Sequence, residues 1–88
     1  MNLNQVKEKV ANIIADVIKV KVDDVKKAKD FTELKIDDLD SVDIIVSLQK
    51  EFDIYILTED VQTINTLNKL AEYVFGKLKK AERDKSGY

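Results

Sequence analysis

The chain has 88 residues, the length of one small domain with a single core. With 44% hydrophobic and 36% charged residues, its composition is that of a folded globular protein. It contains no cysteine and no histidine, which excludes disulfides, Cys-ligated zinc and the common nucleophile–base pairs of hydrolases, so we expect no enzyme. Residues 1–10 are too charged for a signal peptide and no apolar run is long enough to span a bilayer. We therefore expect a cytoplasmic protein, or one of an organelle matrix after processing.

The absence of proline and the presence of only two glycines favour helices over a strand-rich fold with many turns. From Leu3 to Ile18 apolar residues recur in steps of three and four, which predicts an amphipathic helix over roughly residues 4–19. Residues 20–36 lose this period but keep isolated large apolar side chains. We therefore predict a long loop that these side chains pin to the core.

Asp37 has the position of an N-cap for a second helix over residues 37–52. The apolar stripe of this segment is wide, which predicts a central helix. Thr58 begins a short helix of one or two turns, and Thr66 begins a last helix whose apolar period continues to Leu78.

These elements predict an all-α fold, a four-helix up-down bundle with a long loop between its first and second helices and a short third helix. Residues 1–80 form the single predicted domain, and residues 81–88 form a charged tail that we expect to be disordered. Because each helix must bury its stripe, the core is expected to include Val10, Ile14, Val17, Phe31, Leu34, Leu39, Val42, Ile45, Leu48, Phe52, Ile64, Leu70 and Val74.

The net charge of −2 hides an acidic block at residues 37–60, where eight acidic residues accompany one lysine. Such a block repels a phosphate backbone, so we expect no nucleic-acid partner and predict a basic protein surface instead. The alternative is a solvated face whose first acids simply favour a helix start. Asp37, Asp38 and Asp40 offer a weak, oxygen-only surface for Ca²⁺ or Mg²⁺, but their spacing lacks the ligand pattern of a calcium loop, so we expect no dedicated metal site.

The order of elements and the segment at residues 34–56 resemble the acyl carrier protein family. In that family the segment reads Leu-Gly-x-Asp-Ser-Leu-Asp-x-Val-Glu, followed by an acidic turn ending in Glu-Phe. Here Leu34, Asp37, Leu39 and Asp40 match, and Glu51-Phe52 ends the turn. The resemblance covers roughly residues 6–78. It departs at Lys35, where the family has glycine, and at Leu57, where it has proline.

The resemblance implies a carrier whose 4'-phosphopantetheine arm is attached to one serine. Counting back from Phe52 without a gap places that serine at position 38, which is Asp38 in this chain. A carboxylate would give a hydrolysable mixed anhydride instead of a stable phosphodiester, so we expect the prosthetic group to be absent. Ser41 is a less favoured attachment point, one turn further along the helix. Asp38 has three interpretations: natural loss of the serine, an engineered replacement, or an ordinary acid at a helix start.

Two functions follow from the resemblance. The first is a monomeric acyl carrier domain of fatty-acid or related acyl metabolism that docks on basic surfaces of acyl-transfer or synthesis enzymes and of a phosphopantetheinyl transferase. The second is a carrier-like protein-interaction module without a prosthetic group. In both, partner docking is assigned to the acidic second helix and its exit through Asp37, Asp40, Asp43, Glu51 and Glu59.

Overall fold

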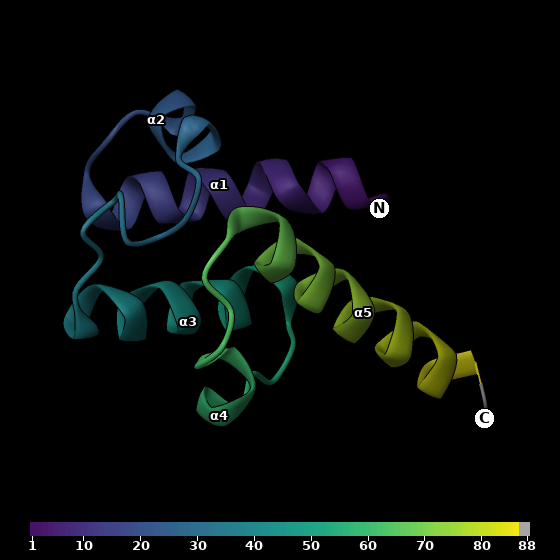
Figure 1. Cartoon of the computed structure of the whole chain (residues 1–88). Helices are drawn as coiled ribbons and strands as arrows, with labels where there is room; N and C mark the ends of the chain where they lie inside the picture. The colour runs from purple at the N-terminus through teal and green to yellow at the C-terminus, as the bar shows by residue number, and fades with distance from the viewer. Residues whose placement is uncertain (87–88) are drawn as a thin grey trace.

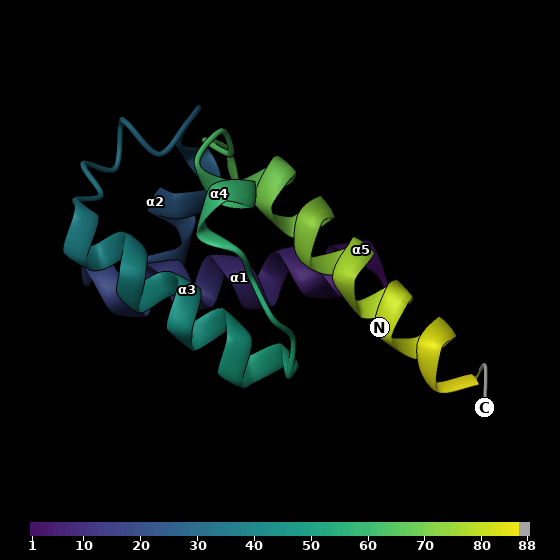
Figure 2. The same cartoon turned by 90° about the horizontal axis from the view of Figure 1, so that it is seen from below.

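A computed structural model describes the backbone of residues 1–86 and the side chains of residues 1–80. Within these residues the fold is all-helical, which confirms the predicted fold class. Figures 1 and 2 show three longer helices packed together, with two short helices in the connections between them. The helices are α1 (Leu3–Ile18), α2 (Val22–Lys27), α3 (Asp38–Phe52), α4 (Thr58–Val61) and α5 (Leu67–Ser86).

Helix α1 is the centre of the bundle, because α2, α3 and α5 each pack against it. Four of its side chains have no exposed surface at all: Val6, Val10, Ala11 and Ile14. Their spacing of three and four residues turns one side of α1 toward the other helices. The prediction that the second long helix would be central was wrong. That helix, α3, packs on α1 with one side and leaves the other exposed.

The helix ends follow from local hydrogen bonding. Asn2 caps α1, because its side chain accepts a hydrogen bond from the Gln5 N–H while the Gln5 side chain accepts one from the Asn2 N–H, each at 2.9 Å. Asp37 caps α3, as predicted, by accepting a hydrogen bond from the Asp40 N–H at 2.7 Å. Thr66 accepts one from the Lys69 N–H at 3.1 Å, so α5 begins where the sequence indicated.

The connection at residues 20–36 contains a helix that the sequence analysis missed. Helix α2 has only six residues, too short for a periodic pattern, and only Val25 is buried. The connection crosses the end of the bundle and returns through Phe31, whose N–H donates to the Asn65 carbonyl at 2.8 Å. Phe31 and Leu34 are half-buried against the core. This agrees with the prediction that large apolar side chains of residues 20–36 hold this connection against the core.

Two predicted core residues lie on the surface: Leu39 is 78% exposed and Val42 is 57% exposed. The core side of α3 is formed by Ile44, Leu48 and Phe52, four residues apart. The apolar stripe of α3 is wider than the side that packs against α1. A periodic pattern in the sequence cannot tell which part of such a wide stripe is buried and which part is exposed. Val10, Ile14, Leu48, Phe52, Leu70 and Val74 are buried as predicted, while Val17, Phe31, Leu34, Ile45 and Ile64 are half-buried.

The C-terminal half of α5 projects past the other helices, as both views show (Figures 1 and 2). The backbone of residues 81–86 continues α5, and residues 87 and 88 lie outside the described part of the chain. The division into a domain at residues 1–80 and a tail stays a prediction. No helix in the described residues is long and apolar enough to cross a membrane.

Candidate functional site

The predicted attachment position, Asp38, is the first residue of α3 and is exposed. It follows Asp37, whose carboxylate is already engaged with the Asp40 N–H. The free N–H groups of a helix start favour negative charge, so carboxylates are stabilised here. Asp38 therefore presents a carboxylate to solvent at the beginning of α3, with no hydroxyl group at that point.

The outer side of α3 presents apolar side chains beside these carboxylates. Leu39 and Val42 are mostly exposed, and Val46, one turn further, is 40% exposed. Contiguous exposed apolar side chains rimmed by charge are typical of protein interaction sites. We call Leu39, Val42 and Val46 the apolar strip of α3.

The five acids assigned to partner docking have different environments. Asp37 caps the helix, and Glu51 forms an ion pair with Lys9 of α1, the Nζ and Oε1 atoms being 3.0 Å apart. Asp43 and Glu59 are exposed and Asp40 is half-buried; within the described residues no ion pair involves any of these three. Among the described residues, Asp40, Asp43 and Glu59 are thus the three of these five acids that neither form an ion pair nor cap a helix.

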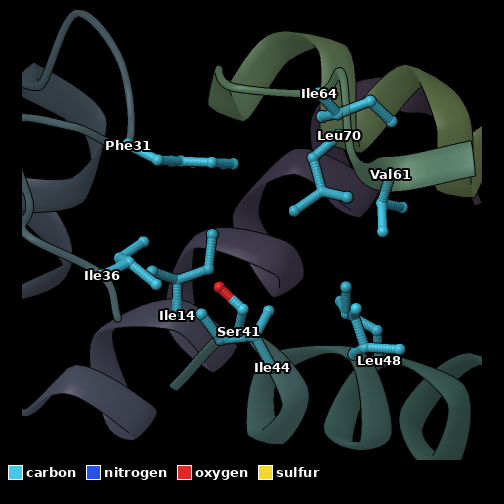
Figure 3. A pocket seen from close by; sticks show the side chains of 10 residues that line it. Ile14, Phe31, Ile36, Ser41, Ile44, Leu48, Val61, Ile64 and Leu70 are labelled. Atoms are coloured by element: carbon cyan, nitrogen blue, oxygen red, sulfur yellow. The ribbon is translucent and has the colours of Figure 1, made fainter. Parts of the chain in front are cut away.

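An apolar pocket of about 80 Å³ lies between α3, α1 and the segment leading into α5 (Figure 3). Ser41 lies at its edge, and Figure 3 shows the hydroxyl oxygen pointing into the space that the apolar side chains enclose. The less favoured attachment residue therefore faces the pocket, one turn from Asp38. The other lining residues are Ile14, Phe31, Ile36, Ile44, Ile45, Leu48, Val61, Ile64 and Leu70.

A larger open groove of about 780 Å³ runs along α3 and adjoins this pocket. The two share six lining residues: Phe31, Ile36, Ser41, Ile45, Val61 and Ile64. The rest of the groove is lined by Thr32, Asp38, Val42, Val46, Gln49, Tyr55, Ile56, Thr58, Gln62 and Asn65. Asp38 and Val42 thus lie on one continuous hollow that leads from the surface toward the core.

Two side-chain hydrogen bonds connect elements near the groove. The Gln49 side chain accepts one from the Ile56 N–H at 2.8 Å, which ties the exit of α3 back to the helix. The Tyr73 hydroxyl donates to Asp60 Oδ2 at 2.9 Å and links α5 to α4. Partial burial raises the pKa of Tyr73, and the Asp60 carboxylate raises it further.

Sequence reasoning missed Tyr55, which is 72% exposed and lines the groove. The exposure of Tyr55 could have been predicted, because residues 54–56 form a short extended connection in which successive side chains point to opposite sides. With Ile54 and Ile56 turned toward the core, Tyr55 points outward. Within the described residues, no group of three acidic side chains is placed to hold a metal ion.

A small helical bundle with an acidic, apolar-striped helix beside a hollow has the architecture of a carrier domain. The family model described as a phosphopantetheine attachment site matches residues 8–74. The acyl carrier protein of Buchnera aphidicola subsp. Schizaphis graminum is 35% identical over 79 residues, covering 89% of this chain and 100% of that protein. The acyl carrier protein of Chlorobium phaeobacteroides is 38% identical over 74 residues, covering 83% of this chain and 95% of that protein.

The chain belongs to the acyl carrier protein family. This confirms the resemblance inferred from residues 34–56. Members of this family are carriers in acyl metabolism and not enzymes, and the family carries 4'-phosphopantetheine.

Proposed function

We propose that this chain is a carrier-type protein of fatty-acid or related acyl metabolism that docks on partner enzymes through α3 and holds no 4'-phosphopantetheine at Asp38. The observation that carries the proposal is the exposure of Leu39 and Val42 between carboxylates. An apolar centre with a charged rim is the usual arrangement of a transient protein interface.

The partner surface is proposed to be basic, with an apolar depression for the apolar strip. Asp40, Asp43 and Glu59 supply its negative rim, since they have no salt-bridge partner among the described residues of this chain. Asp37 contributes charge at the start of α3 while it caps the helix, whereas Glu51 is engaged with Lys9 of α1. Charges of this kind act mainly on association rate and selectivity, so binding should weaken with salt.

The residues at the start of α3 do not fit the attachment of the arm. Attachment needs a hydroxyl oxygen that forms a stable phosphodiester, and Asp38 offers a carboxylate. The next hydroxyl along α3 belongs to Ser41, which lines the inner pocket. We therefore derive no step through the arm. A monomeric state and a cytoplasmic location stay predictions.

Intact-mass spectrometry after incubation with coenzyme A and a broad-specificity phosphopantetheinyl transferase tests the proposal. We expect no adduct on the present chain, an adduct of about 340 Da on Asp38→Ser, and no effect of Ser41→Ala. Circular dichroism should show the same helix content in all three proteins, because serine is compatible with a helix start.

Two outcomes would contradict parts of the proposal. An adduct on the present chain that disappears in Ser41→Ala would move the attachment point to Ser41. If folded Asp38→Ser stays unmodified, transferase recognition is missing, and the second function applies: a carrier-like interaction module without a prosthetic group. The free carboxylate at Asp38 specifically favours that alternative.

A further inference from the structure

We propose that the basic C-terminal end of α5 docks on the acidic outer side of α3 in a second copy of this chain, so that two copies form a weak dimer. The monomer predicted from the sequence is then the form present in dilute solution or at high salt. Partner enzymes are proposed to bind the same side of α3, so the dimer goes beyond the proposed function and competes with that docking.

The C-terminal half of α5 concentrates positive charge. Residues 77–86 contain five basic and two acidic residues, and this half of the helix projects past the rest of the bundle (Figures 1 and 2). Lys79 and Lys80 are exposed, and Lys77 is half-buried with its Nζ atom 5.5 Å from the centre of the Tyr73 ring. Among the described side chains, none of the three lysines forms an ion pair. Their positive charge is therefore available to an acidic partner surface.

Gly76 leaves the backbone of α5 uncovered beside these lysines. It is exposed, and a Cβ atom placed there would meet no other atom within 4 Å, so no contact with the described residues calls for glycine. Glycine in an exposed helix interior is less favourable than alanine. Position 76 lies one turn before Lys79 and Lys80. The end of α5 thus offers a place where a side chain of another molecule can approach the helix closely beside positive charges.

The outer side of α3 has the opposite shape and charge. Leu39 stands out from it with 78% of its surface exposed, and Val42 follows with 57%. Asp40 and Asp43 accompany the apolar strip, and among the described residues neither forms an ion pair. A projecting apolar side chain beside carboxylates complements an uncovered backbone beside lysines.

The spacing of the charges allows two ion pairs in one contact. Asp40 and Asp43 are three residues apart on α3, as Lys77 and Lys80 are on α5, so each pair spans about 4.5 Å along its helix. A parallel alignment that sets position 39 beside position 76 also sets Asp40 beside Lys77. The same alignment sets Asp43 beside Lys80. Ion pairs at such an exposed contact are weak and screened by salt, which predicts a weak, salt-sensitive dimer.

Within one chain the end of α5 does not reach α3. Helix α5 packs against α1, and its C-terminal half lies away from α3 in both views (Figures 1 and 2). A second copy supplies the acidic surface without disturbing this packing. When each copy places its α5 end on the α3 of the other, the two contacts are related by a two-fold axis and the dimer closes.

Analytical ultracentrifugation of the full-length chain, without any enzyme or coenzyme A, tests the proposal. Between about 20 µM and 1 mM protein, the average mass should rise toward that of a dimer in about 20 mM sodium chloride and stay near that of the monomer in about 500 mM. Neither Asp38 nor a partner enzyme takes part, so the result does not depend on the mass-spectrometric test of the proposed function.

Charge reversal identifies the two surfaces. Lys77→Glu with Lys80→Glu should abolish self-association, because like charges then face each other. Asp40→Lys with Asp43→Lys should do the same. An equimolar mixture of these two variants should associate at least as strongly as the original chain, since opposite charges meet again at both contacts. Circular dichroism verifies that each variant keeps its helix content.

Two further variants separate the contact from net charge and from folding. Lys27→Glu with Lys29→Glu makes the same change in net charge at exposed residues in and beside α2, and should keep most of the association. Gly76→Gln should weaken the dimer by about threefold to tenfold while it raises the melting temperature of the monomer, since glutamine favours a helix.

Four results would overturn the proposal: a chain that stays monomeric in low salt, folded charge-reversed variants that do not associate when mixed, an α2 variant that loses association as fully as the α5 variant, or a Gly76→Gln variant whose dimer is unchanged.

Discussion

Lys35 is a residue whose backbone conformation suits glycine better than lysine. Its φ of 54° lies in the left-handed region, which costs a residue with a side chain about 1 kcal/mol or more. Position 35 immediately precedes the turn into α3, so the backbone there sets how the helix start is presented. The family pattern has glycine at this position, and the structure supplies the physical reason.

We expect Lys35→Gly to raise the free energy of unfolding by about 0.5 to 1 kcal/mol. The gain is smaller than the relieved strain because glycine also increases the entropy of the unfolded chain. Urea denaturation measures it. Lys29→Gly is the matched control: Lys29 does not have a positive φ, so this change should lower stability. Equal effects of the two substitutions would contradict the explanation.

The titration of Tyr73 should make the free energy of unfolding depend on pH. Its pKa is raised in the folded protein by burial and by Asp60, so the unfolded chain loses this proton first as pH rises. The contribution of Tyr73 is therefore fully present below the unfolded pKa of about 10, and it is lost as pH rises through the higher folded pKa.

We expect Tyr73→Phe to cost about 0.5 to 1 kcal/mol at pH 7, through loss of the hydrogen bond to Asp60. Above pH 10 the difference between the two proteins should shrink, because the tyrosine then carries a charge next to a carboxylate. Urea denaturation at pH 7 and pH 10.5 measures both values. A difference that is constant across this range would show that Tyr73 does not titrate differently in the folded state.

At the scale of elements, α3 serves two surfaces at once. Ile44, Leu48 and Phe52 bury one side against the core, while the apolar strip occupies the outer side. A helix in this position needs only its inner side for stability, so its outer side is available for partner contacts.

This division predicts opposite effects for two leucines of the same helix. Leu48 is fully buried, and Leu48→Ala should cost about 2 to 5 kcal/mol of unfolding free energy. Leu39 is 78% exposed, and Leu39→Ala should change stability by no more than about 0.5 kcal/mol. Thermal denaturation followed by circular dichroism compares them. A loss above 2 kcal/mol for Leu39→Ala would place that side chain in the core after all.

At the scale of the whole molecule, charge is unevenly distributed. Residues 37–60 carry a net charge of −7, whereas the chain as a whole carries −2. The structure places most of this block on α3 and α4, and the described residues contain one ion pair to it, Lys9 with Glu51. The acids must therefore repel one another in the folded state.

We expect the melting temperature to rise by several degrees as sodium chloride increases from about 20 mM to 500 mM, since salt screens this repulsion. Magnesium chloride should act through screening as well, since no described group of acids is arranged to hold a metal ion. Replacing Asp43 and Asp53 by asparagine together should reduce the salt dependence. A melting temperature that falls with salt would show that favourable ion pairs dominate instead.

Local features of the sequence determined where most helices begin, because capping is a short-range interaction. Asp37 and Thr66 accept hydrogen bonds from N–H groups three residues ahead, and both starts were predicted. The central stripe of α1 was predictable for the same kind of reason, since a period of three to four residues follows from helix geometry alone. The resemblance to the family could also be recognised from the residue types and their spacing in residues 34–56.

Only the tertiary structure decided which apolar side chains of α3 are covered. Leu39, Val42 and Leu48 are all large and apolar, and their burial depends on where α1 and the connection from α2 lie, which no local pattern encodes. The same holds for Ser41 and Asp38. They are three residues apart in the chain and both are exposed, yet only Ser41 also lines the inner apolar pocket, because side chains from α1, α3, α4, α5 and the segments before α3 and α5 converge only once the helices have packed.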